Sequence, residues 1–196
     1  MPHTTTSKAL YQTLYKQLRP AIDHERECHA IVSRLLAHYG GIEAVQIALD
    51  TPIALTPAQQ QQLDTAVQRL VRQEPLQYVL GVTPFFSRTF SVSPAVLIPR
   101  PETESLVQHI VADNPQAGRR VLDIGTGSGC IAITLQQELP QATVDALDIS
   151  AAALQVATAN AAQLGATVHY FQADILQTPL PDKLWDVIVS NPPYVR

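Results

Sequence analysis

The sequence predicts an α/β protein in which a small all-α helical bundle and a β-hairpin linker precede a parallel sheet flanked by helices. Short apolar runs alternate with helical patterns after residue 120, and the first run leads through a glycine-rich turn into a helix. Before residue 73, leucine and isoleucine recur at helical spacing. We expect a helical bundle over residues 1–74, a linker over 75–100 and the domain with the sheet over 101–196.

The composition is that of an ordinary globular chain, since 46% of its 196 residues are hydrophobic and 15% are charged. No apolar run approaches the roughly 18 residues that span a bilayer, and the N-terminus lacks a signal-peptide core. A cytoplasmic protein with no membrane partner is expected. The formal net charge of −4 gives no general attraction to nucleic acid, so no nucleic acid partner is predicted.

Four helices are expected in the bundle. Gly40 and Gly41 end the second helix, and a third spans Ile42–Leu49. Thr56 has the character of an N-cap, with Pro57 at the first position of the fourth helix. The apolar residues expected to face the core are Leu10, Leu14, Leu18, Ile22, Ile31, Leu35, Leu36, Leu63, Val67, Leu70 and Val71.

One segment of the bundle has ligand-like spacing. His24 and Cys28, and likewise Glu25 and His29, stand four residues apart on a helix. A solvated helix face of mixed charge has the same pattern, and we favour that interpretation. No metal is predicted. The second cysteine, Cys130, is too far from Cys28 in sequence to suggest a disulfide framework, so both are expected to be reduced.

Between Pro75 and Pro101 the pattern indicates extended structure. Tyr78–Leu80 and the alternating apolar residues over 85–92 predict the hairpin linker. Two prolines then hold an extended entry to a helix over Glu102–Asp113. Arg100 and Glu102 belong either to a rigid lead-in or to a pair of opposite charges near a ligand.

The glycine-rich turn is the first motif that carries chemistry. Its pattern is D-x-G-x-G-x-G from Asp123 to Gly129, whereas a dinucleotide fingerprint would need a glycine where Cys130 stands. Glycine allows positive φ and close approach of a ligand to the main chain. We therefore predict a small-molecule site at Gly125, Thr126, Gly127, Ser128 and Gly129. The D-x-G-x-G-x-G arrangement resembles that of S-adenosylmethionine sites, so this ligand is expected; a βα turn that binds nothing is the alternative.

Two acidic residues follow the next strands. After a helix over Ser128–Leu139 and a strand over Ala142–Leu147, Asp148 stands at the carboxyl end of the neighbouring strand, where it can accept both hydroxyls of a ribose. It could equally cap the helix expected over Ala151–Leu164.

The third strand, expected over Thr167–Phe171, leads to the second acid. Asp174 can accept an adenine amino group, with Ile175 beside the ring. A plain loop aspartate is the alternative.

The last strand, expected over Trp185–Val189, leads to the second sharp motif. The two prolines of Asn191-Pro192-Pro193-Tyr194 fix the backbone and leave carbonyls as acceptors at the end of a parallel strand. We predict a pocket for a planar NH₂ group. The side-chain oxygen of Asn191 and the carbonyl of Pro192 would accept its two N–H bonds, and Tyr194 would cover the flat target. A proline-rich turn without a role is the alternative.

With these motifs in this order, the chain resembles class I S-adenosylmethionine-dependent methyltransferases that act on amino nitrogens. Together with Pro75–Tyr78 and Leu97–Glu104, they resemble the PrmC/HemK family of release-factor glutamine methyltransferases along essentially the whole chain. The resemblance implies a Rossmann-like sheet, S-adenosylmethionine as cofactor, and N5-methylation of the glutamine in the Gly-Gly-Gln motif of peptide chain release factors. It also implies that the helical bundle helps to dock the protein substrate.

Carried over by position, the cofactor would be bound by Gly125–Gly129, Asp148, Asp174, Ile175 and Asn191, and the glutamine by Asn191–Tyr194. Some relatives have an aromatic residue in place of Ile175. Members also continue beyond the position of Arg196, so we expect a C-terminally truncated sheet. Alternative functions are an amino methyltransferase for a ribosomal-protein glutamine or for adenine or cytosine in nucleic acid, and an inactive binding module.

Overall fold

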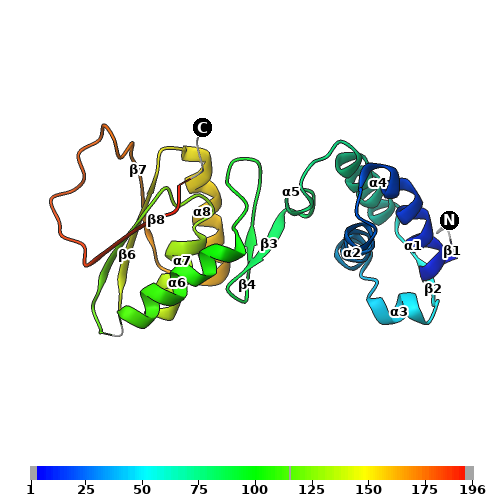
Figure 1. The fold of residues 1–196 in the computed structure, drawn as a ribbon, viewed down its shortest axis with the longest axis horizontal. Coiled ribbons are helices and arrows are strands. Elements are labelled where there is room, and N and C mark those ends of the chain that lie inside the picture. The colour runs from blue at the N-terminus through cyan, green and yellow to red at the C-terminus, as the bar shows by residue number, and fades with distance from the viewer. Residues whose placement is uncertain (1–3, 115, 193–196) are drawn as a thin grey trace. The chain divides into compact units, whose positions relative to one another are not determined.

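The computed structural model describes residues 4–114 and 116–192 and divides the chain into two compact units, Met1–Leu80 and Gly81–Arg196 (Figure 1). The boundary at Leu80 differs from the divisions at residues 74 and 100 that the sequence suggested. The reason is that Phe85 and Phe90 of the hairpin lie in the core of the second unit, together with Val121 and Ile133.

The first unit is helical, as predicted. Its helices are α1 (Ser7–Leu18), α2 (Glu25–Leu35), α3 (Ala44–Ala48), α4 (Pro57–Val71) and α5 (Leu76–Leu80), with a 3₁₀ turn at Arg19–Ala21 and a π turn at Leu36–Gly40. The leucines at helical spacing form the core, and Leu14, Leu18, Leu35, Leu36 and Leu63 are at most 2% exposed.

The predicted helix ends in this unit are confirmed. Gly41 adopts φ +64° after the π turn that extends α2, and its N–H donates to Ala37. The hydroxyl of Thr56 accepts from the backbone N–H of Gln59, and the backbone N–H of Thr56 donates to Oε1 of Gln59 in the reciprocal bond of a capping box. Pro57 is the first helical residue.

Two local expectations were wrong or incomplete. Tyr78–Leu80 is helical rather than extended, since the N–H groups of Tyr78 and Val79 both donate to the carbonyl of Pro75. A run of three apolar residues carries no period, so it could not distinguish strand from helix. The antiparallel pair of β1 (Thr4–Thr6) and β2 (Pro52–Ala54) was not predicted.

The second unit has the predicted α/β fold. An antiparallel hairpin of β3 (Val82–Phe85) and β4 (Arg88–Ser91) is followed by alternating helices and strands, except that a loop joins the last two strands. These elements are α6 (Pro101–Asp113), β5 (Arg120–Ile124), α7 (Cys130–Glu138), β6 (Thr143–Asp148), α8 (Ala151–Leu164), β7 (His169–Gln172) and β8 (Val187–Ser190).

The four strands β7, β6, β5 and β8 pair in that order, and all are parallel. Ile124 pairs with Leu147 and Ser190, so β5, β6 and β8 end at the same level. Because β6 and β8 lie on opposite sides of β5, the strand order reverses there, and such a switch point is where open α/β sheets bind ligands.

Candidate functional site

The carboxyl edge of the sheet brings together the segments that the sequence predicted as a site. The glycine loop follows β5, Asp148 ends β6, Asp174 follows β7 and Asn191 follows β8. Segments far apart in the chain thus meet at one edge because the strands are parallel and in register.

The glycine loop is shaped by positive φ angles and by the neighbouring strand. Gly125, Gly127 and Gly129 have φ of +73°, +55° and +80°. The N–H groups of Gly125 and Thr126 both donate to the carbonyl of Leu147, at 2.9 and 3.0 Å. A Cβ on Gly125 or Gly127 would meet no atom within 4 Å, so the loop leaves open space beside its main chain.

Asp123 lies beneath this loop and is fully buried. Its Oδ2 accepts from the hydroxyl of Thr126 at 2.7 Å. Burial raises the pKa of Asp123 to about 6, while hydrogen bonds from Thr126 and the backbone of Ala132 oppose the rise and the negative charge of Asp148 adds to it. The carboxylate therefore holds the loop and adds negative charge below it.

Asp148 holds the loop from the adjacent strand and is half-buried. Its Oδ2 accepts from the N–H of Gly127 and its Oδ1 from the N–H of Ser150, both at 2.9 Å. The N-cap of α8 is Ser150, whose hydroxyl accepts from Ala153. Each carboxylate oxygen can accept more than one hydrogen bond, so both retain capacity for ligand hydroxyls.

Asp174 lies in a tight turn after β7. Its Oδ1 accepts from the N–H of Leu176 at 2.9 Å and its own N–H donates to the hydroxyl of Thr178. Ile175 is 40% exposed, which leaves much of its side chain available to a ligand. Asp174 therefore forms a loop turn, and its carboxylate still has capacity to accept an adenine amino group.

Asn191 is fixed by a contact that the sequence did not reveal. Its Nδ2 donates at 2.9 Å to the hydroxyl of Thr103, in the first turn of α6 and 88 positions earlier in the chain. This bond leaves the side-chain oxygen of Asn191 as an acceptor. Pro192 is exposed, and the predicted contributions of Pro193 and Tyr194 lie outside the described residues.

Arg100 and Glu102, the pair of opposite charges considered in the sequence analysis, lie at the start of α6. Arg100 precedes the helix as its N-cap residue and Glu102 lies in its first turn; both are exposed. Within residues 4–114 and 116–192, neither side chain makes a hydrogen bond or ion pair that would assign it a role.

Two family models match the chain. The first, described as a methyltransferase small domain, matches residues 101–196, and the second, described as a PrmC N-terminal domain, matches residues 9–81. A release factor glutamine methyltransferase from Flavobacterium psychrophilum is 40% identical over 190 residues, which cover 95% of this chain and 67% of that relative. The chain belongs to the release factor glutamine methyltransferase family.

Other members of the release factor glutamine methyltransferase family are more similar over shorter stretches. The relative from Bacteroides thetaiotaomicron is 48% identical over 79% of this chain and 56% of its own length, and that from Koribacter versatilis is 51% identical over 72% and 51%. The chain thus spans about half the length of these relatives.

Three residues near the site of this family member were missed by sequence reasoning. Thr103 stands in the lead-in that helped to suggest the family, but nothing in the sequence pairs it with Asn191. Asn160 is a polar residue on the buried alanine stripe of α8, which was a usable signal. Ile149 follows Asp148 and is 63% exposed, an unusual exposure for isoleucine.

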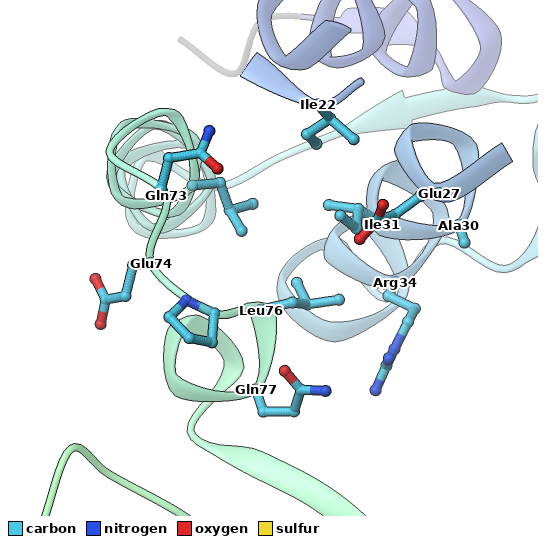
Figure 2. Close-up of a pocket in the computed structure, with 11 residues that line it drawn as sticks. Ile22, Glu27, Ala30, Ile31, Arg34, Gln73, Glu74, Leu76 and Gln77 are labelled. Carbon is cyan, nitrogen blue, oxygen red and sulfur yellow. The ribbon is translucent and has the colours of Figure 1, made fainter. Parts of the chain in front are cut away.

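The first unit of this family member contains a separate hollow of about 430 Å³ (Figure 2). Ile22 and Leu76 lie on opposite sides of it, and Glu74 points away because its carboxylate binds Arg69. Its lining residues are Ile22, Glu27, Ala30, Ile31, Arg34, Leu70, Gln73, Glu74, Pro75, Leu76 and Gln77.

The ligand-like segment of α2 has structural partners in this family member. Cys28 is fully buried, whereas the ring of His29 stacks on Tyr15 and its Nδ1 bonds the hydroxyl of Tyr11 at 2.6 Å. Among the described residues, no group of His, Cys, Asp or Glu could hold a metal ion. Within residues 4–114 and 116–192, no helix is long and apolar enough to cross a membrane.

Proposed function

We propose that this chain binds S-adenosylmethionine at the carboxyl edge of its sheet and methylates N5 of the glutamine in the Gly-Gly-Gln motif of peptide chain release factors. The observation that carries the proposal is the asparagine amide held by Thr103 at the edge that also bears the glycine loop. A methyl donor and a flat amide acceptor could meet there.

The residues beside the glycine loop fit this cofactor. S-adenosylmethionine carries positive charge on its sulfonium and ammonium groups, and the nearby carboxylates of Asp123 and Asp148 favour cations. Asp148 has acceptor capacity for the ribose hydroxyls. The open space over Gly125 and Gly127 admits a ligand against the main chain.

The adenine end would lie along the neighbouring loops. Asp174 would accept the adenine amino group. The exposed side chains of Ile149 and Ile175 would cover the ring, because contact with it would remove their apolar surface from water. An aliphatic contact with Ile175 replaces the aromatic one expected in some relatives.

Asn191 has the central part in the reaction. An amide nitrogen is a poor nucleophile because its lone pair is delocalised into the carbonyl. The side-chain oxygen of Asn191 and the backbone carbonyl of Pro192 would accept the two N–H bonds of the glutamine, aim its nitrogen and stabilise the positive charge that develops there. S-adenosylmethionine bound beside the glycine loop would supply the methyl group, with S-adenosylhomocysteine as the leaving group. The nitrogen would then release one proton to water.

The release factor is also the partner that the relatives' names suggest. We propose that the helical unit helps to dock it and that the reaction takes place in the cytoplasm, where translation ends. Neither nucleic acid nor a membrane is part of this proposal.

The test is methyl transfer from labelled S-adenosylmethionine, with a release factor, a ribosomal protein and a DNA duplex offered in parallel. We expect label in the release factor alone. Asn191→Ala should abolish transfer while cofactor affinity, measured by calorimetry, is largely kept; Asn114→Ala, the same change at the end of α6, serves as control.

Each alternative has its own outcome in this test. Label in the ribosomal protein or the DNA would identify a different amino methyltransferase, and cofactor binding without transfer would identify a binding module. Transfer by Asn191→Ala at a rate near the wild type would refute the assignment of Asn191.

A further inference from the structure

The hairpin of β3 and β4 is bound at two places to the elements that carry the proposed site. Its turn contacts α6, which holds Asn191, and the end of β4 contacts α8, which holds the glycine loop. Both contacts are made by a side chain to the hairpin backbone. A hairpin that merely links two domains would not require either.

The contact at the end of β4 is made by Asn160, which is fully buried. Its Oδ1 accepts from the N–H of Ser91 at 2.8 Å, and its Nδ2 donates to the carbonyl of Ser91 at 3.0 Å. The same Nδ2 donates at 2.9 Å to the carbonyl of Ser128, within the glycine loop. The amide orientation is fixed, because a flipped amide would place its oxygen against two carbonyls.

This arrangement uses a polar residue where packing alone would favour an apolar one. Asn160 shares the buried stripe of α8 with Ala153, Ala157 and Ala161. A buried amide is costly unless it is hydrogen-bonded, and here both protons of Nδ2 and the oxygen have partners. The bonds join α8 to Ser128 and Ser91, which precede Asn160 in the chain by 32 and 69 positions.

The turn of the hairpin is held by Glu104. Phe86 and Ser87 have φ of +48° and +60°, which is strained for residues other than glycine. The N–H of Phe86 donates at 2.9 Å to Oε1 of Glu104, the residue that follows Thr103 in α6. The carboxylate therefore ties the strained turn to the helix turn that fixes Asn191.

We propose that the hairpin is a frame that sets the glycine loop and Asn191 relative to one another, with Asn160 and Glu104 as its positioning residues. The frame runs from the carbonyl of Ser128 through Asn160 to β4, and from the hairpin turn through Glu104 to α6. Its relevance to catalysis rests on the proposed function, in which the loop seats the cofactor and Asn191 grips the glutamine.

The first experiment needs no ligand. Hydrogen exchange is compared between the wild type and Asn160→Asp, which keeps the side-chain shape but turns a carboxylate oxygen toward two carbonyls. Gln155→Glu, the same chemical change at an exposed position of α8, is the matched control. We expect faster exchange at Ser91 and over 125–129 in Asn160→Asp alone. Unchanged exchange in both segments would overturn the frame.

The second experiment measures the affinity for S-adenosylhomocysteine, the product of the cofactor, which binds without turnover. We expect Asn160→Asp to weaken binding by about tenfold or more, since the loop loses a buried donor, and Gln155→Glu to change it less than about twofold. Affinity retained by a folded Asn160→Asp protein would overturn the role of Asn160. If that variant fails to fold, Asn160→Ala replaces it under the same criteria.

Glu104→Ala separates the two ends of the frame, with Gln108→Ala on the same helix as control. We expect Glu104→Ala to speed exchange at Phe86 and to lower the methyl transfer rate more than it lowers cofactor affinity. Equal losses of rate and affinity would show a general structural role. If the wild type does not bind the cofactor, the proposed function fails, while the exchange data still decide whether the frame exists.

Discussion

The two units differ in what they bury. Among the described residues, the first unit buries one polar side chain, Ser7, whereas the second buries eight: Thr83, Thr103, Asp123, Thr126, Ser128, Thr134, Asp145 and Asn160. Burial of a polar group costs free energy unless it is paired. The first unit is thus organised by apolar packing, and the second accepts buried polar groups that shape the edge of its sheet.

This contrast shows where the second unit is constrained by more than stability. Thr126 and Asp123 hold the glycine loop, Thr103 holds Asn191, and Asn160 holds the hairpin. Changes at such positions should alter the site or its pH dependence, whereas comparable changes in the first unit should act through stability alone.

The largest effect is expected for Gly129→Ala, at the start of α7. Gly129 has φ +80°, and a Cβ there would lie 2.9 Å from Ile133 Cδ1, 3.0 Å from the hydroxyl of Tyr170 and 3.1 Å from Ala157 Cβ. Strain and overpacking together should cost about 3 kcal/mol or more. Urea unfolding followed by the fluorescence of Trp185, the single tryptophan of the chain, measures this loss in the second unit.

Gly118→Ala is the matched control for the backbone part. Gly118 has φ +75° but a Cβ there would meet no atom within 4 Å, so about 1 kcal/mol is expected. Equal losses for the two variants would mean that the space around Gly129 is not limiting.

Asp123→Asn should give the next largest effect, with a sign that depends on pH. The pKa of Asp123 is raised from 3.8 to about 6 in the folded chain, so ionisation destabilises the fold. The cost is absent below about pH 4, grows as the pH rises towards 6 and is constant above it, reaching about 3 kcal/mol. Asparagine should therefore stabilise the second unit above pH 6 and have little effect at pH 4.

The measurement is urea unfolding across this pH range, again followed by Trp185. Asp182→Asn, an exposed site in the same unit, should change stability by less than about 0.5 kcal/mol at any pH. A gain for Asp123→Asn that is the same at pH 4 and pH 7 would contradict the raised pKa.

Thr103→Val should have a smaller effect on stability but a specific one on the site. The variant keeps the shape of the side chain and leaves the amide of Asn191 without its acceptor, at a cost of about 1–2 kcal/mol. Methyl transfer should slow by more than cofactor affinity falls. Thr103→Ser, which retains the hydroxyl, should transfer methyl groups at a rate near that of the wild type. A rate as low as that of Thr103→Val would mean that the methyl group of Thr103, and not its hydroxyl, positions Asn191.

The sequence predicted most of the elements and the meeting of the candidate residues at one edge of the sheet, but not the side-chain contacts that hold those residues. Periodicity found the leucine core of the first unit, and the capping residue Thr56 was visible because caps are local. The glycine loop and Asp148 were placed at one edge because strand order follows from βαβ connections. The pairing of Asn191 with Thr103 spans 88 positions and depends on side-chain geometry, which neither spacing nor propensity encodes.

The smallest effect is expected in the first unit, for Glu74→Gln. The hydrogen bond and charge of Arg69 lower the pKa of Glu74, so its ionised form stabilises the fold above pH 4.5 and this contribution is lost as the pH falls below that value. The sign is opposite to that of Asp123. Both partners of the ion pair are about one-third exposed, which keeps its contribution small.

Hydrogen exchange of first-unit amides should show a modest acid destabilisation in the wild type and less in Glu74→Gln. If acidification instead stabilised both units alike, a shared solvent effect rather than the environment of each carboxylate would govern their pH dependence.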